Sequence, residues 1–263
     1  MADLAQFTAQ NKFLMLALDH RRSIKKYLQT DEEIVEFKRQ IIENLKSQFS
    51  GILIDVEYGF PAYKNMNKPF LLPVEKSGYR EIDGGRVTEL ERSTEELKKL
   101  GAAGIKLLLY FNPKGETAKQ QLETARQVSE DCAKEDLPFF LEIVTYGATP
   151  KQKFVTDSVK YLLEGGVYPD VFKLEYPGDA ESCKHITEIL GKTPWILLTA
   201  GEDFDLFKMY LQIAIQNGCS GFLAGRALWK EALQLQGDER KKFLSEILIT
   251  RFKEISQIAL NAA

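Results

Sequence analysis

The sequence predicts an α/β fold, a single (β/α)8 TIM barrel that takes up residues 1–263 as one domain. Three observations lead to this prediction. Eight short apolar segments recur along the chain, helical segments lie between most of them, and no linker rich in proline, glycine or serine divides the sequence. A doubly wound open sheet is the competing α/β fold, because the same alternation of strands and helices is typical of it.

The expected strands are short segments rich in leucine, isoleucine, valine and phenylalanine, as is typical of parallel strands that are covered on both faces. In chain order they are Phe13–Leu18, Gly51–Asp55, Phe70–Val74, Gly104–Tyr110, Pro138–Tyr146, Asp170–Tyr176, Trp195–Ala200 and Gly221–Ala224.

The expected helices are recognised by apolar residues at helical spacing and by their end signals. They are Asp31–Gln48, a helix opened by Thr149 and Pro150 and closed by Gly165 and Gly166, Asp203–Gln216, and a long final helix, Glu239–Leu260. The segment Glu57–Pro69 is too short for a full crossover helix, so a turn of helix and a loop are expected there.

The composition excludes several classes of protein. With 35 Lys and Arg residues against 38 Asp and Glu residues, the chain lacks the basic excess of a general nucleic-acid or anionic-membrane binder. No segment approaches the ~20 apolar residues of a membrane span, and the N-terminus lacks the order of a signal peptide. Three scattered cysteines indicate free thiols in a reducing compartment, and two histidines are too few for an ordinary zinc site. We therefore expect a cytoplasmic protein with no metal site and no nucleic-acid or membrane partner.

Charged residues interrupt or end several of the expected strands, where apolar residues would be easier to bury. They are Asp19, Asp55, Glu57, Glu75, Lys106, Glu142, Lys173 and Glu175. Because side chains alternate between the two faces of a strand, Lys173 and Glu175 share one face. On a single strand such charges indicate an ordinary solvent-facing edge. At the ends of several strands of a barrel, they indicate a catalytic lumen.

Lys106 and Lys173 each lie among large aliphatic or aromatic residues. Burial and a second nearby cation both lower the pKa of a lysine, and a neutral lysine can attack a carbonyl to form a Schiff base. Glu142, on the strand between the two lysine strands, could then move the protons that this chemistry requires. A buried Lys–Glu ion pair that only fills the lumen is the alternative, and the pattern alone does not separate the two interpretations.

A phosphate site is predicted where the last two strands end. Gly201 and Gly225 follow these strands, and glycine lets main-chain N–H groups approach an anion. Arg226 adds a guanidinium that can donate two hydrogen bonds to a phosphate. Barrels often bind phosphate at the ends of strands seven and eight.

Eight motifs, in this order and at this spacing, resemble one family. They are Leu16–Arg21, Leu53–Gly59, Glu75–Tyr79, Ile105–Tyr110, Phe140–Glu142, Lys173–Pro177, Thr199–Gly201 and Ala224–Trp229. The chain is similar, over almost its whole length, to the class I tagatose-1,6-bisphosphate aldolases and the related sulfofructosephosphate aldolases. It departs from the usual family sequence after Asp19, where it has His20 instead of glutamine. His20 could bind the distal phosphate or sulfonate beside Arg21 and Arg22, but we expect it to cap the loop after the first strand.

The resemblance implies a role for each matched residue. Lys173 would be the Schiff-base lysine, Glu142 the acid–base, and Lys106 the neighbouring cation that lowers the pKa of Lys173 and contacts substrate oxygens. Asp19 would position the lysines or substrate hydroxyls. Gly201, Gly225 and Arg226 would hold the phosphate of the dihydroxyacetone-phosphate half of the substrate. We expect one of Arg21 and Arg22, which follow the first strand, to bind the phosphate or sulfonate at the distal end.

The predicted function is therefore a class I aldolase, an aldehyde-lyase that needs neither metal nor cofactor. It would cleave a six-carbon ketose phosphate, of the tagatose 1,6-bisphosphate or 6-deoxy-6-sulfofructose 1-phosphate type, into dihydroxyacetone phosphate and a three-carbon aldehyde. The resemblance also suggests a homo-oligomer. Two alternatives remain at this point: an aldolase for a deoxy-keto acid phosphate, and a non-catalytic barrel that binds a sugar phosphate and regulates another process.

Overall fold

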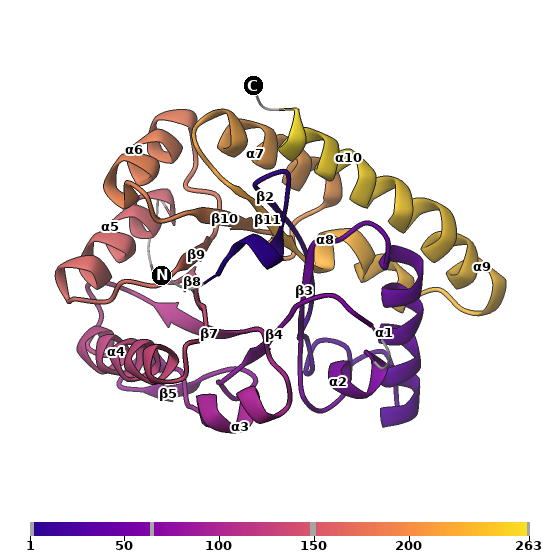
Figure 1. Cartoon of the computed structure of the whole chain (residues 1–263), viewed down its shortest axis with the longest axis horizontal. Helices are drawn as coiled ribbons and strands as arrows, with labels where there is room; N and C mark the ends of the chain where they lie inside the picture. Colours follow the sequence, from indigo (N-terminus) through magenta and orange to yellow (C-terminus); the bar gives the residue numbers. More distant parts are fainter. Residues whose placement is uncertain (1–2, 64–65, 148–150, 262–263) are drawn as a thin grey trace.

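Eight parallel strands form a closed ring in the computed structural model, which describes residues 3–63, 66–147 and 151–261 apart from the side chains of 151–153 (Figure 1). The strands are β2 (Lys12–Leu18), β3 (Gly51–Ile54), β4 (Phe70–Pro73), β7 (Gly104–Phe111), β8 (Phe139–Thr145), β9 (Val171–Leu174), β10 (Trp195–Leu198) and β11 (Gly221–Ala224). Each strand pairs with its neighbour in the chain order, and β11 pairs with β2. This closure confirms the predicted barrel and shows that the open sheet is wrong.

Helices lie outside the ring, as expected of a (β/α)8 barrel (Figure 1). They are α1 (Asp31–Leu45), α2 (Gly59–Ala62), α3 (Thr94–Lys99), α4 (Ala118–Lys134), α5 (Lys151–Glu164), α6 (Ala180–Leu190), α7 (Phe204–Gln216), α8 (Arg226–Trp229), α9 (Gly237–Lys242) and α10 (Ile249–Leu260). The short α2 confirms the expected single turn between β3 and β4. The expected helix start at Thr149 and Pro150 lies outside the described residues. The final helix also forms as expected, with a π-helical segment, Phe243–Leu248, between α9 and α10.

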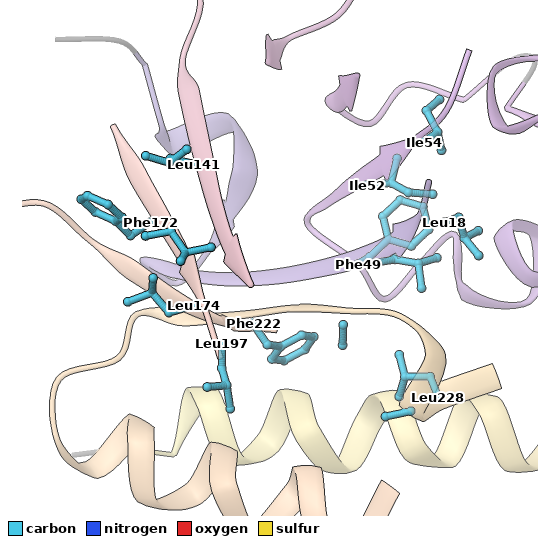
Figure 2. Packing of buried hydrophobic residues seen from close by; sticks show 14 of the residues in the cluster. Leu18, Phe49, Ile52, Ile54, Leu141, Phe172, Leu174, Leu197, Phe222 and Leu228 are labelled. Carbon is cyan, nitrogen blue, oxygen red and sulfur yellow. The ribbon is translucent and has the colours of Figure 1, made fainter. Parts of the chain in front are cut away.

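Side chains of each strand alternate between an outer and an inner hydrophobic layer. Figure 2 shows part of the outer layer, in which Ile52, Ile54, Phe172 and Leu174 pack in the space between strands and helices. The inner layer fills the lumen with the residues of opposite parity, such as Leu53. The polar residues of the strands can therefore enter the lumen without disturbing the packing of the helices.

The N-terminal segment closes one end of the lumen. It contains the short 3-10 helix Ala5–Phe7 and strand β1 (Thr8–Ala9), drawn in indigo across the middle of the ring in Figure 1. The ring of Phe7 contacts that of Phe140 edge to face, with 5.3 Å between centroids. Ser50 fixes the segment, because its hydroxyl donates to the main-chain oxygen of Phe7. With this end filled, the C-terminal ends of the strands are the open end of the barrel.

A β-hairpin that the sequence analysis did not predict lies between β4 and α3. It consists of β5 (Arg80–Ile82) and β6 (Gly85–Val87), and its turn residues Asp83 and Gly84 both have positive φ, as tight hairpin turns require. The guanidinium of Arg86 lies 4.5 Å from the ring centroid of Tyr79 and 4.7 Å from that of Tyr146, so it ties the hairpin to the barrel.

Candidate active site

A cavity of about 350 Å³ opens at the C-terminal ends of the strands. Its wall includes eight of the nine residues predicted for the site, namely Asp19, Arg21, Arg22, Lys106, Glu142, Lys173, Gly225 and Arg226. Gly201 lies just behind the wall, against the guanidinium of Arg226. The fold therefore gathers residues from the whole length of the chain at one place.

The period of a β-strand explains why these side chains face the cavity. On β7, Lys106, Leu108 and Tyr110 are spaced by two residues and all line the cavity, whereas Leu107 and Leu109 pack in the outer layer. Lys173 and Glu175 share the inner face in the same way, as the sequence predicted. The Oε2 atom of Glu175 accepts hydrogen bonds from the main-chain nitrogen and the hydroxyl of Thr145.

A cluster of two lysines and three carboxylates occupies the floor of the cavity. The Nζ atom of Lys106 lies 2.9 Å from Oδ2 of Asp19 and 3.2 Å from Oε2 of Glu142, and it also donates to Oε1 of Glu75. Oε2 of Glu142 lies 2.8 Å from Nζ of Lys173. Glu142 therefore bridges the two lysines. We call these five residues the lysine–carboxylate cluster.

In this cluster, the attraction between lysines and carboxylates outweighs burial and sets the direction of the pKa shifts of Lys106, Glu142 and Asp19. Burial opposes the charge of Lys106, but Asp19, Glu75 and Glu142 together raise its pKa well above the usual value. Burial also opposes the charge of Glu142, yet the attraction of Lys173 and Lys106 lowers the pKa of Glu142. The pKa of Asp19 is lowered in the same way, against burial, mainly by Lys106. Lys106 is thus an ammonium group, and Asp19 and Glu142 are carboxylates.

Two of the strand charges that suggested a lumen, Asp55 and Glu57, do not line the cavity. Asp55 turns toward α1, where it pairs with the buried Lys38 and accepts hydrogen bonds from the main-chain nitrogens of Tyr58 and Gly59. Lys38 also donates to the main-chain oxygen of Leu18, at a distance of 2.7 Å. This pair joins α1 to the ends of β2 and β3. The sequence could not separate Asp55 from the lumen residues, because its partner comes from a helix.

Arg226 is the cation at one end of the cavity. An added Cβ on Gly201 would lie 3.1 Å from its Cζ, a tight contact that would displace the guanidinium by a few tenths of an ångström. Ala200 and Gly201 both have positive φ, and Lys230 donates to the main-chain oxygens of Gly201 and Glu202. The guanidinium of Arg226 has no hydrogen bond or ion pair with the described residues, and its Nε atom is buried. This arrangement offers hydrogen-bond donors to an anion.

Arg21 and Arg22 have different surroundings. The guanidinium of Arg21 donates to Oε2 of Glu91 at 2.8 Å and to the main-chain oxygen of Glu75 at 3.0 Å, so it holds the cavity wall together. Arg22 is exposed and lies against Gly78, whose positive φ and missing Cβ make room for it. Lys76 and Ser77 line the cavity beside it.

His20, from the loop after β2, packs against Gly225 and Trp229, which follow β11. Its ring contacts that of Trp229 edge to face, with 5.1 Å between centroids, and an added Cβ on Gly225 would lie 2.8 Å from its Cε1. Burial lowers the pKa of His20 to about 3, although Asp19 opposes the shift. The imidazole is therefore neutral near pH 7.

Two residues of the site have no role among the sequence-based predictions. Glu75 appears there as a strand charge and as the first residue of a family motif, and Tyr110 only as the last residue of a strand and of a motif. The signal that could have found Tyr110 is the spacing of two residues from Leu108 and four from Lys106, which places it on the inner face. The partner of Glu75 could not be read from the sequence, because Lys106 is on another strand.

The described residues include no group of three or more His, Cys, Asp or Glu side chains placed to hold a metal ion. They also include no helix long and apolar enough to cross a membrane. Cys132, Cys183 and Cys219 are buried free thiols, as expected.

Comparison with known proteins is consistent with this geometry. The model of the DeoC/LacD family of aldolases matches residues 13–231. The tagatose 1,6-diphosphate aldolase of Listeria monocytogenes serotype 4b (strain CLIP80459) is 30% identical over an alignment that covers 91% of this chain and 83% of the relative. That of Staphylococcus aureus (strain bovine RF122 / ET3-1) is 31% identical, with 92% and 88% covered.

Solved structures share the fold at lower identity. A Schiff-base-forming fructose-1,6-bisphosphate aldolase superposes with a TM-score of 0.68 at 20% identity, covering 93% of this chain and 96% of the other. An archaeal fructose-1,6-bisphosphate aldolase, with its catalytic lysine bound to a carbinolamine intermediate, gives 0.70 at 19% identity, with 95% and 97% covered. The family match and the curated relatives confirm the prediction that the chain is an aldolase. The chain belongs to the DeoC/LacD family of aldolases.

Proposed function

We propose that this aldolase cleaves a six-carbon ketose phosphate through a Schiff base on Lys173, releasing dihydroxyacetone phosphate and a three-carbon aldehyde. One observation carries the proposal: a single carboxylate oxygen, Oε2 of Glu142, lies 2.8 Å from Nζ of Lys173 and 3.2 Å from Nζ of Lys106. This places a proton acceptor beside a candidate nucleophile inside an enclosed lumen.

The charge environment favours Lys173 over Lys106 as the nucleophile. Three carboxyl groups surround Lys106, and two of them, the carboxylates of Asp19 and Glu142, hold it as an ammonium group. An ammonium group has no lone pair for attack on a carbonyl. Within the part of the cluster that the structure describes, Lys173 pairs with Glu142. Lys106 would then act as a fixed cation toward substrate oxygens, with Asp19 holding it in place.

In the proposed reaction, the amine of Lys173 adds to the C2 carbonyl, and the carbinolamine loses water to give an iminium. The C4 hydroxyl then gives its proton to Glu142 while the C3–C4 bond breaks. The bonding pair moves toward the iminium nitrogen, so the products are an aldehyde and an enamine. Protonation of the enamine at C3 and addition of water release dihydroxyacetone phosphate. The iminium accepts the electron pair, so this route needs no metal ion.

The two ends of the cavity suit the two ends of such a substrate. Arg226, backed by Gly201 and Gly225, would bind the phosphate of the dihydroxyacetone-phosphate half. At the other end, Arg22 would bind the distal phosphate or sulfonate with Lys76 and Ser77, because Arg21 already donates to Glu91 and to the main chain. The curated relatives are named for tagatose 1,6-diphosphate, which makes that sugar the first substrate to assay.

The test is to trap the Schiff base. The protein is incubated with dihydroxyacetone phosphate, reduced with sodium borohydride, and examined by intact mass and peptide mapping. We expect one adduct on Lys173 in the wild type and none in Lys173→Met, with Lys46→Met as a matched surface control that still forms it. An adduct that persists in folded Lys173→Met and maps to Lys106 would overturn the assignment.

A further inference from the structure

Glu75 is held rigidly at a position that the proposed reaction does not use. It follows β4, is 4% exposed, and lines the cavity. Its main chain bridges to Leu90, and its carbonyl oxygen accepts a hydrogen bond from Arg21. Its Oε1 accepts a hydrogen bond from Lys106. Its Oε2 is buried and has no hydrogen-bond partner among the described residues.

The charges of the lysine–carboxylate cluster do not balance if all five groups are ionised. If both lysines are ammonium groups, two carboxylates balance them, and Asp19 and Glu142 can supply these two, because Asp19 contacts Lys106 and Glu142 contacts both lysines. Glu75 makes the shortest contact with Lys106, through Oε1 alone. A third carboxylate would leave a net negative charge in a buried site. It would also leave an anionic oxygen, Oε2 of Glu75, with no donor to satisfy it, and such a group is costly to bury.

We propose that Glu75 is a positioning residue that remains a neutral carboxylic acid in the resting enzyme, so that it orients Lys106 without adding a charge to the cluster. Oε1 would be the carbonyl oxygen that accepts from Lys106, and Oε2 would carry the proton. An unpaired hydroxyl in this place costs less free energy than an unpaired anionic oxygen.

The groups that face Glu75 agree with this assignment. Lys106 favours its charged form, but burial raises the pKa of Glu75, and Asp19 and Glu142 add to the shift. Arg21 donates to the main-chain oxygen of Glu75 and is itself paired with Glu91. The neighbouring Lys76 pairs with Glu89 at 3.8 Å. Among the described residues, Glu75 is the carboxyl whose pKa is raised, while the pKa values of Asp19 and Glu142 are lowered.

The consequence for the reaction, which rests on the proposed Schiff base, concerns Lys173. A nearby negative charge stabilises the ammonium form of a lysine, and Lys173 must lose its proton before it can attack. A neutral Glu75 leaves Glu142 as the carboxylate in contact with Lys173, and Glu142 can accept that proton. Ionisation of Glu75 would place a further negative charge beside Lys106, which Glu142 links to Lys173. This charge would favour the ammonium form of Lys173 and slow Schiff-base formation.

An infrared measurement tests the protonation state without using the reaction. A neutral carboxylic acid has a carbonyl band distinct from that of a carboxylate. We expect this band in the wild type near pH 7, its loss in Glu75→Gln, and its retention in Glu43→Gln, which changes an exposed glutamate paired with Lys46. In the wild type, raising the pH should remove the band. Absence of the band at pH 7 would overturn the proposal whether or not Lys173 forms a Schiff base.

Kinetics of two variants provide the second test. Glutamine resembles the neutral acid, so Glu75→Gln should keep kcat within about threefold of the wild type, and its pH profile should lack the decline that accompanies ionisation of Glu75. Glu75→Asp, shorter and more easily ionised, should be the more impaired variant. The opposite order, with Glu75→Asp active and Glu75→Gln at least about thirtyfold slower, would show that the charge is required and would overturn the proposal.

Discussion

The guanidinium of Arg226 lies directly against the main chain of Gly201, so that an added Cβ on Gly201 would come within 3.1 Å of Cζ and 3.2 Å of Nη2. The first residue comes from the end of β11 and the second from the loop after β10. Their contact leaves the guanidinium facing the cavity without a partner among the described residues. Arg226 and Gly201 together therefore form a more specific candidate for the phosphate site than Gly201 or Gly225 would alone.

Removal of this cation should weaken the binding of dihydroxyacetone phosphate. A charge-assisted hydrogen bond contributes about 1.5–3 kcal/mol, so Arg226→Ala should raise the KM for dihydroxyacetone phosphate in the condensation direction roughly tenfold to a hundredfold. The KM for the aldehyde should change little. Arg39→Ala, which removes an exposed arginine of α1, is the control and should change neither value. A rise confined to the aldehyde KM would mean that the two ends have been assigned in the wrong order.

Arg21 and Arg22 should behave differently when replaced by alanine. Arg22→Ala should raise the KM for the aldehyde and alter the preference between phosphate and sulfonate aldehydes, because Arg22 is the exposed cation beside Gly78. Arg21→Ala should instead lower the free energy of unfolding, because it removes donors from Glu91 and from the main chain of Glu75. Paired KM and urea-unfolding measurements on both variants check this. A larger substrate effect in Arg21→Ala, with unchanged stability, would contradict the assignment.

Glu142→Gln should separate catalysis from binding. Loss of a general base lowers kcat by about 10²–10⁴-fold, whereas amide and carboxylate have nearly the same shape. Because Lys173 and Lys106 lower the pKa of Glu142, the base is ionised near neutral pH, and the wild type should lose this activity only on acidification. Pre-steady-state kinetics with dihydroxyacetone phosphate would show whether the Schiff base still forms. A kcat within threefold of the wild type would exclude Glu142 as the base.

His20 should make the fold sensitive to acid. Its pKa is about 3 in the folded state, against an ordinary value near 6.5, so the unfolded chain binds this proton first as the pH falls. The free energy of unfolding should therefore decrease by up to about 1.4 kcal/mol for each unit of pH between about 6.5 and 3, and be unaffected above that range. His20→Gln removes this proton uptake and should flatten the dependence in chemical denaturation at several pH values. Equal slopes for the two proteins would show that His20 is not buried as a neutral ring.

Much of the site could be predicted from the sequence because strands have a period of two. Lys106, Glu142 and Lys173 are interruptions of apolar strands, and an interruption is visible without a structure. The same rule failed for Asp55, which has the parity of a lumen residue but pairs with Lys38 on α1. The period of two also did not predict the β5–β6 hairpin, whose position depends on the contacts of Arg86 with Tyr79 and Tyr146.

The sequence by itself determined the barrel, its strands and the inventory of lysines and carboxylates, because hydrophobic periodicity is a local property of the chain. Only the tertiary structure decided how these groups pair. It brought Lys106 to the carboxyl groups of three other strands or strand ends and placed Lys173 beside Glu142. It also turned Arg21 into the wall and Arg22 toward the cavity. The physical reason is that charge interactions depend on distances of a few ångströms between residues that are far apart in the sequence, and closure of the barrel sets those distances.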